Sequence, residues 1–493
     1  MEFGSIRFFL LLTLTLIALR VVAGLKAKKV VILIASCAFY AAWDWRYLGL
    51  LLLIGAINHA LVLYIDANTS KRVRYGGLSV AVVFDLLVLG YFKYANFFLD
   101  TLNGFLAKGS PASPLLQIVL PVGISFYIFK LISYAVDVHR RQIEPCRTLL
   151  DFLTFLTFFP ELIAGPIVRA SVFLPQLSRD VGFDRKRFAS GASQFAFGAV
   201  KKFFIADHLA IIADATFSDP SVWSTGTMWC GVIAYSIQIY CDFSGYSDMA
   251  IGTARIIGYD LPENFNMPYL ARNIAEFWRR WHMSLSQWLR DYLYIPLGGN
   301  RRGEARTYIN LFLTMLIGGL WHGASWNFVV WGGLHGLALA VHRLWSRGRS
   351  GASLFPAWLG VVSTALFVTL AWVPFRASSW EATLEIWRKL FFGAPSEQTA
   401  WHPFWLWPCL ALVVIGHVIG SRIFGIGSEK TDGKLFDVGY RWLGLKPEAN
   451  AISGPVVTMS RVTVGGVFCA MTAIILLLLF MPLTANPFIY FQF

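Results

Sequence analysis

A histidine stands between two apolar runs in the stretch NLFLTMLIGGLWHGASWNFVVWGG, residues 310–333. We expect this residue, His322, to lie deep within a membrane beside Trp321. Ionisable side chains are costly there, so a functional role is the default hypothesis. An imidazole in a polar cavity can act as a general base that takes a proton from a hydroxyl as the oxygen attacks a carbonyl. The alternative is a histidine that only forms a hydrogen bond between helices.

A second histidine lies in EFWRRWHMSLSQWLRDYLYIPLGGN, residues 276–300. The spacing predicts one helix with Arg279, His282, Ser286 and Arg290 on one face. Tryptophan and arginine on such a helix suit the membrane interface, where guanidinium groups bind phosphate. One hypothesis is therefore an interfacial anchor. The other is that His282 and Arg279 face a buried polar site or an anionic donor, with Trp278 and Ser286 as further candidates. The opposite face is aromatic and apolar: Phe277, Trp281, Leu285, Trp288 and Tyr292.

Two other patterns bear on the chemistry. Asp242, Ser244, Ser247 and Asp248 form a polar cluster inside an apolar span. Buried carboxylates need partners, for which nearby arginine and lysine residues are candidates, so a structural role is one interpretation. His335 follows His322 by thirteen residues. On one straight helix that is about 220° of rotation and about 20 Å of rise, which excludes a same-face metal pair. No HExxH or similar ligand spacing occurs in the chain, so we expect no metal site.

The composition indicates which class of protein holds these residues in place. The 493-residue chain is 56% hydrophobic and only 14% charged, whereas soluble domains carry about 25% charged residues. An integral membrane protein is therefore predicted: all-α and polytopic, with roughly 10–12 spans of about 20 residues each. The formal net charge is +14. Because the basic residues cluster beside apolar segments, they indicate membrane topology and contact with lipid, not nucleic acid.

Every second loop between the predicted spans is rich in lysine and arginine, and the loops between these are far less basic. The first five spans fit the positive-inside rule if the chain starts outside, and we expect the first to be retained rather than cleaved as a signal peptide. The stretch 151–169, DFLTFLTFFPELIAGPIVR, is broken by proline and glycine and is predicted to be a re-entrant or buried broken helix. The predicted spans are Phe8–Leu25, Val30–Trp43, Leu48–Ile65, Leu78–Phe98, Leu116–Val138, Phe188–Phe217, Met228–Ile257, Tyr308–Trp345, Leu359–Trp372, Phe404–Ile419 and Val464–Leu483.

These segments suggest a division of the chain into four parts. Residues 1–148 are N-terminal membrane helices, and 149–345 are a catalytic core with re-entrant and interfacial helices. Residues 346–485 are C-terminal membrane helices with a polar loop at 427–460. An aromatic tail, NPFIYFQF, occupies 486–493 and is expected on the outer face.

Six segments carry a resemblance to a known family. Between residues 89 and 324 the chain contains LGYFKYANFF, LPVGISFYIF, FFPELIAGPI, DFSGYSDMAIG, EFWRRWHMSLSQWLRDYLYIPLGGNR and NLFLTMLIGGLWHGA. They resemble the membrane-bound O-acyltransferase superfamily, and most of all its bacterial alginate O-acetyltransferase branch. The resemblance implies a helical bundle with a central tunnel, a near-invariant histidine at His322 and a second histidine at His282.

The resemblance also implies partners. Acetyl would arrive from a cytoplasmic donor, acetyl-CoA, with no bound cofactor, and would leave towards an envelope polysaccharide with the help of a periplasmic SGNH-type protein. The tail resembles an aromatic C-terminal motif whose tyrosine is implicated as a transient acyl carrier, a role that falls on Tyr490. The alternative for the tail is an aromatic belt at the membrane interface.

We therefore predict an O-acetyltransferase of the bacterial inner membrane, with its C-terminal tail on the periplasmic side. Within this class, acetylation of peptidoglycan or cellulose and D-alanyl transfer to teichoic acid stay open. The rival from another class is a transporter of glycan or lipid. Transporters often contain repeats with matching broken helices, and the sequence shows none.

Overall fold

The structure is a computed structural model. It describes residues 1, 3–106, 114–347, 356–393, 400–423, 445–450, 454–459 and 488. The chain forms two compact units, Met1–Ala192 with Met249–Pro262 and Ser193–Asp248 with Glu263–Phe493. The proposed division at residues 148, 345 and 485 stays a prediction. The predicted span Val464–Leu483 lies outside the described residues.

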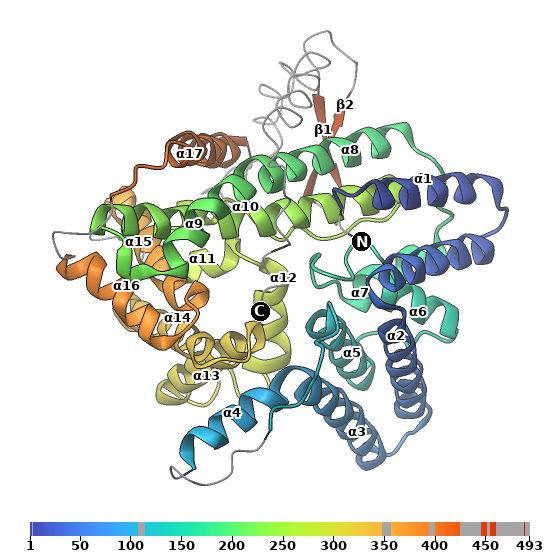
Figure 1. Cartoon of the computed structure of the whole chain (residues 1–493). Helices are drawn as coiled ribbons and strands as arrows, with labels where there is room; N and C mark the ends of the chain where they lie inside the picture. Colours follow the sequence, from blue (N-terminus) through green and yellow to red (C-terminus); the bar gives the residue numbers. More distant parts are fainter. Residues whose placement is uncertain are drawn as a thin grey trace. The chain divides into compact units, whose positions relative to one another are not determined.

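All regular secondary structure in the described part of the first unit is helical (Figure 1). Two helices, α8 (Arg185–Ala199) and α10 (Thr225–Ile257), contribute residues to both units. The remaining segments of the first unit are α1 (Ile6–Val21), α2 (Leu25–Ala67), α3 (Lys71–Leu89), π-helical η1 (Gly90–Tyr94), α4 (Ala95–Phe105), α5 (Ile124–His139), α6 (Leu149–Thr157), α7 (Ala170–Phe173) and 3₁₀-helical η2 (Leu174–Ser178).

The second unit is also mainly helical, which confirms the all-α class. A short antiparallel hairpin is the exception: β1 (Leu445–Asn450) pairs with β2 (Gly454–Met459) inside the predicted polar loop. The helical segments of this unit are η3 (Val200–Ala206, π), α9 (Asp207–Ser218), η4 (Pro220–Val222, 3₁₀), η5 (Pro268–Leu270, 3₁₀), α11 (Ile274–Arg280), α12 (Met283–Leu289), η6 (Arg290–Tyr294, π), α13 (Glu304–His322), α14 (Trp326–Ser346), α15 (Ala357–Arg376), α16 (Trp380–Phe392) and α17 (Leu406–Ile423).

Three helices of the described part are long and apolar enough to cross a bilayer: Leu25–Ala67, Lys71–Phe105 and Ala357–Arg376. The first contains a break at Asp44 (φ −158°, ψ 114°). The Asp44 carboxylate accepts a hydrogen bond from the backbone N–H of Arg46 at 2.9 Å and so stabilises the break. Two helical segments result, as the sequence predicts. The total of 10–12 spans and the central tunnel stay predictions.

The predicted span Leu116–Val138 is helical only in its second half, because α5 begins at Ile124. Pro121 and Gly123 explain the late start. Gly123 has φ +76°, and a Cβ there would lie 2.6 Å from the carbonyl oxygen of Leu162. Glycine therefore lets the backbone enter α5 against the buried segment that follows α6.

The broken segment after α6 is confirmed. Residues 158–168 form no helix, and all of them are buried. Lys130 on α5 supports this segment: its Nζ lies 2.5 Å from Oε1 of Glu161 and donates to the carbonyl of Phe155 at 2.6 Å. Buried charges need such partners, so the ion pair holds irregular backbone within the core of the unit.

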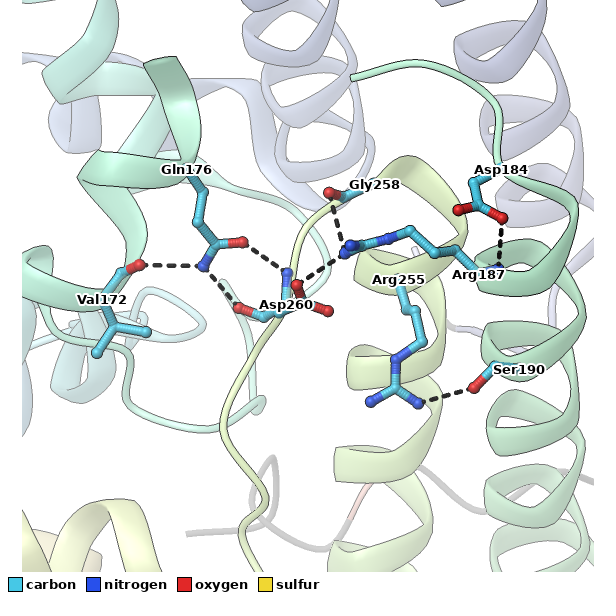
Figure 2. Close-up of polar contacts among 8 residues, drawn as sticks. All are labelled: Val172, Gln176, Asp184, Arg187, Ser190, Arg255, Gly258 and Asp260. Atoms are coloured by element: carbon cyan, nitrogen blue, oxygen red, sulfur yellow. Dashed lines mark hydrogen bonds and ion pairs between the residues drawn. The ribbon is translucent and has the colours of Figure 1, made fainter. Parts of the chain in front are cut away.

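Polar side chains also anchor the chain that leaves α10 (Figure 2). The side-chain amide of Gln176 bonds both backbone groups of Asp260, accepting from its N–H at 2.8 Å and donating to its carbonyl at 2.9 Å. Arg187 pairs with the Asp260 carboxylate at 2.8 Å and donates to the carbonyl of Gly258. The backbone of this irregular stretch is thereby satisfied by side chains, as buried backbone must be.

The predicted single span Tyr308–Trp345 is wrong, because the structure folds it into a hairpin of α13 and α14, which lie side by side (Figure 1). Extended backbone at Gly323 ends the first helix, and the Ser325 hydroxyl caps the second by accepting from the N–H of Asn327 at 3.1 Å. The two helices approach closely at glycine: a Cβ on Gly332 would lie 2.4 Å from the carbonyl oxygen of Met315.

Candidate active site

His322 is the last residue of α13 and is buried, with 4% of its surface exposed. Aromatic rings surround it. The ring centroid of Trp331 lies 5.0 Å from that of His322, and the centroid of Phe375 lies 5.3 Å away, both near edge-to-face. His322 is thus buried within the protein, and its depth in a membrane stays a prediction. Its place is the joint of a hairpin instead of the interior of one span.

His282 lies at a break between α11 and α12, so the predicted continuous helix over residues 276–300 is wrong. Its backbone is left-handed (φ 44°, ψ 54°), a conformation that costs a non-glycine residue about 1 kcal/mol or more. The next backbone N–H, that of Met283, bonds the carbonyl of Asn264 at 2.9 Å instead of continuing the helix. The apolar periodicity runs through the break, which is why the sequence pattern does not reveal it.

The proton of His282 can be assigned from its neighbours. Nδ1 lies 3.2 Å from Oδ1 of Asn264. The same oxygen accepts from the backbone N–H of Ser284 at 3.3 Å. A backbone N–H can only donate, so this atom of Asn264 is the oxygen, and Nδ1 of His282 must carry the hydrogen. The lone pair therefore sits on Nε2, which is buried and has no hydrogen-bond partner among the described residues.

Two tryptophan rings alternate with three histidines of the second unit, His282, His322 and His335. Trp321 lies 6.2 Å from His282 and 5.0 Å from His322, between ring centroids. Trp331 lies 5.0 Å from His322 and 4.8 Å from His335. The hairpin thus brings His335 near His322, which the assumption of one straight helix did not anticipate. The structure brings the two predicted catalytic histidines together around one indole.

The other candidates from residues 276–300 divide between core and surface. Trp278 is buried and meets the ring of His335 edge-on at 5.1 Å. Arg279 is exposed, so it does not join His282 in the buried site. Ser286 is half-buried, and its hydroxyl donates to the carbonyl of Trp281 at 3.3 Å. A role for these residues in donor binding stays a prediction.

The acidic cluster on α10 has the cationic partners that its burial demands. Lys202 lies 2.6 Å from the carboxylate of Asp242 and 2.8 Å from that of Asp207. Lys201 pairs with Asp248. Such pairing is what the structural interpretation predicts for Asp242. Ser244, its neighbour in the sequence cluster, is 1% exposed.

Tyr490, the predicted acyl carrier, lies outside the described residues. Phe488, two residues earlier, is described and is 3% exposed. Its ring centroid lies 4.5 Å from that of Tyr246 and 5.9 Å from that of Phe243. Phe243 in turn meets the ring of His282 edge-on at 4.7 Å. One residue of the C-terminal tail is therefore buried beside the histidine site.

Sequence reasoning missed two contributors to this site. Asn264 orients His282, and the lysine pair at residues 201 and 202 neutralises the carboxylates of α10. The cluster of carboxylates in an apolar span was the available signal for the lysines, because buried carboxylates need cationic partners. Nothing in the stretch ENFNMPY signals Asn264, because its contact with His282 crosses irregular chain. Within the described residues, no group of three or more histidine, cysteine or acidic side chains could hold a metal ion.

Comparison with known proteins identifies the family. The model of the membrane-bound O-acyltransferase family, MBOAT, matches residues 147–378. A protein of Azotobacter vinelandii named "Probable alginate O-acetylase AlgI" is 44% identical over 400 residues, which cover 80% of this chain and 79% of that protein. The chain belongs to the membrane-bound O-acyltransferase family. It is an O-acyltransferase and crosses the membrane more than once.

The names of two further relatives state a different polymer or a different transferred group. The peptidoglycan O-acetyltransferase of Helicobacter pylori is 39% identical over 385 residues, covering 73% of this chain and 72% of that protein. The teichoic acid D-alanyltransferase of Bacillus subtilis is 26% identical over 291 residues, covering 56% of this chain and 73% of that protein. Each of the three names describes transfer of an acyl group and includes a polymer: alginate, peptidoglycan or teichoic acid.

Proposed function

We propose that this enzyme transfers acetyl from acetyl-CoA across the bacterial inner membrane for O-acetylation of an exported polysaccharide, alginate. The observation that carries the proposal is the 44% identity over 80% of the chain to the alginate O-acetylase of Azotobacter vinelandii. The relatives named for peptidoglycan and teichoic acid are less similar, at 39% and 26% identity. They supply the alternatives that the experiment must separate.

In the proposed reaction, the oxygen of an acceptor hydroxyl attacks the thioester carbonyl carbon. His322 takes the hydroxyl proton, the C–O ester bond forms, and the C–S bond breaks. The imidazolium then returns the proton to the departing CoA thiolate, so that protons balance. His282 assists through the Nε2 lone pair that its hydrogen bond to Asn264 leaves open.

The first acceptor in this scheme is the phenol of Tyr490. A phenol is more acidic than a sugar hydroxyl and therefore leaves more readily, which keeps the acetyl activated for a second transfer. The buried position of Phe488 beside Phe243, whose ring contacts His282, supports a tail that works at this site. The second transfer, to the polysaccharide, would take place on the periplasmic side with an SGNH-type partner.

The decisive experiment compares two histidine variants in cells that export alginate. His322→Ala should abolish the esters on the polymer while the protein still accumulates in the membrane. His402→Ala, a change at an exposed histidine of the same unit, should leave them at the wild-type level. Acetate and alanine released by mild base from alginate, peptidoglycan and teichoic acid identify both the group and the polymer.

Normal acetylation by His322→Ala would defeat the mechanism. Alanine in place of acetate, or acetate on peptidoglycan alone, would defeat the proposed substrate. The carrier step has its own test, in which purified protein is incubated with radiolabelled acetyl-CoA. Label should appear on the wild-type protein and be absent from Tyr490→Phe.

A further inference from the structure

The side chain of Asn264 contacts the ring of His282 and also the backbone and hydroxyl of Ser284, two residues further along the chain. It lies in an irregular stretch between α10 and η5, and it is 1% exposed. Its Oδ1 faces three groups: Nδ1 of His282 at 3.2 Å, the backbone N–H of Ser284 at 3.3 Å and the hydroxyl of Ser284 at 2.9 Å. Its Nδ2 donates to the hydroxyl of Ser247 at 3.3 Å. Both ends of the amide are thus used, and the amide has one orientation.

The backbone of Asn264 holds the same turn. Its carbonyl accepts from the N–H of Met283 at 2.9 Å, and the N–H of Asn266 bonds the carbonyl of Arg280 at 2.9 Å. These bonds run on both sides of His282, whose left-handed backbone needs outside support. Asn264 therefore contacts both the ring of His282 and the backbone that follows it, and Asn266 bonds the backbone that precedes it.

We infer that Asn264 is a positioning residue for acyl transfer, which sets the tautomer and ring direction of His282 so that the Nε2 lone pair faces the reaction. The inference rests on the proposed role of His282 in the reaction. Two facts support it. The second neighbour of Nδ1, the Ser284 hydroxyl at 3.5 Å, donates its own hydrogen to Asn264 and so offers only lone pairs to the ring. The ring is also held edge-on by Phe243 at 4.7 Å, so it cannot turn freely without a clash.

Comparable arrangements set the scale of the effect. Partners that orient a metal-bound histidine through its second ring nitrogen typically account for about 10–100-fold in activity or metal affinity when removed, and we take the same range for His282. A carboxylate can perform the same task, as in histidine–aspartate pairs of hydrolases. Asparagine does so here without adding a buried charge, which a site of this burial would have to neutralise.

The test compares substitutions that keep or remove the acceptor. Asn264→Leu has nearly the same size and no acceptor, and we expect kcat to fall about 10–100-fold with the KM for acetyl-CoA within about twofold of wild type. Asn264→Asp keeps an acceptor for Nδ1–H and should retain kcat within about fivefold. Ser247→Ala removes only the contact on the amide nitrogen and should stay within about twofold. The assay is acetyl transfer from radiolabelled acetyl-CoA to Tyr490, the proposed first acceptor, in the purified full chain in nanodiscs; its single-turnover rate constant serves as kcat and the half-saturating acetyl-CoA concentration as KM.

A merely structural role predicts the opposite order, because a buried carboxylate is more disruptive than leucine. Equal losses in Asn264→Leu and Asn264→Asp, or full activity of Asn264→Leu, would overturn the inference. If Asn264→Leu fails to fold, Asn264→Ala replaces it as the variant without an acceptor. His322→Ala in the same assay separates the two proposals. If it stays active, the proposed mechanism fails, whereas an inactive His322→Ala beside an active Asn264→Leu refutes only the role of Asn264.

Discussion

The buried ion pair of the first unit allows a quantitative prediction. Lys130 and Glu161 are 2.5 Å apart, with side chains 4% and 1% exposed. Lys130→Met would leave the carboxylate of Glu161 buried without its cation. Breaking a buried pair in this way costs about 3–5 kcal/mol. We expect the free energy of unfolding of this unit to fall by that amount.

The double variant Lys130→Met/Glu161→Met separates charge from hydrogen bonding. It removes both charged groups and leaves one acceptor unsatisfied, the carbonyl of Phe155, to which Lys130 donates. An unsatisfied buried acceptor costs about 1–3 kcal/mol. The double variant should therefore be more stable than the single variant by about 2 kcal/mol. Lys71→Met, at an exposed lysine of the same unit, is the matched control and should change little.

Unfolding of the purified protein can be followed with a thiol-reactive dye. Cys37 and Cys146 are half-buried thiols of the first unit, and a background in which the other cysteines are replaced by alanine makes the signal specific to that unit. A single variant within 1 kcal/mol of wild type would refute the reasoning. So would a double variant less stable than Lys130→Met.

Three further predictions concern the second unit. Gly332→Ala should lower acetyl transfer at least about tenfold and destabilise the protein by about 1–3 kcal/mol, because the new Cβ would lie 2.4 Å from the Met315 carbonyl. Gly333→Ala, whose Cβ would have no neighbour closer than 3.8 Å, is the control, and equal effects of both changes would contradict this. His335→Phe should keep activity within about threefold and raise the thermal midpoint. Neither ring nitrogen of His335 has a hydrogen-bond partner in the described part of the chain, so phenylalanine removes two unsatisfied buried polar atoms. A loss of activity beyond about tenfold would instead give His335 a chemical role. Phe488→Ala should lower acetyl transfer more than Phe488→Leu does, with both thermal midpoints near wild type, and unchanged activity would show that the buried tail residue is dispensable.

The sequence was sufficient for the membrane class, the break after α6 and the two candidate histidines. These features depend on composition, on proline and glycine, and on an ionisable residue inside an apolar run, all of which are local signals. The hairpin at Gly323 was not predicted, because apolar residues continue on both sides of a three-residue turn and hide it within one long hydrophobic segment.

The orientation of His282 could not be predicted for a different reason. Its left-handed backbone has no characteristic neighbour in the sequence, and the helical spacing of Phe277, Trp281 and Leu285 continues across it. Asn264 lies in irregular chain, where no periodicity relates it to a partner. Contacts between irregular segments are tertiary information, which patterns within one segment do not contain.

The polar contacts of the site join residues that are close along the chain. Asn264 and His282 are 18 positions apart, and Asn264 and Ser284 are 20 apart. The α13–α14 hairpin that carries His322 begins at Glu304, after α12 and η6. Loop closure over such short separations is fast and loses little entropy. During synthesis, the oriented histidine can therefore form before the ribosome has made the last helices. The contacts that orient His282 then form early in the biogenesis of this enzyme.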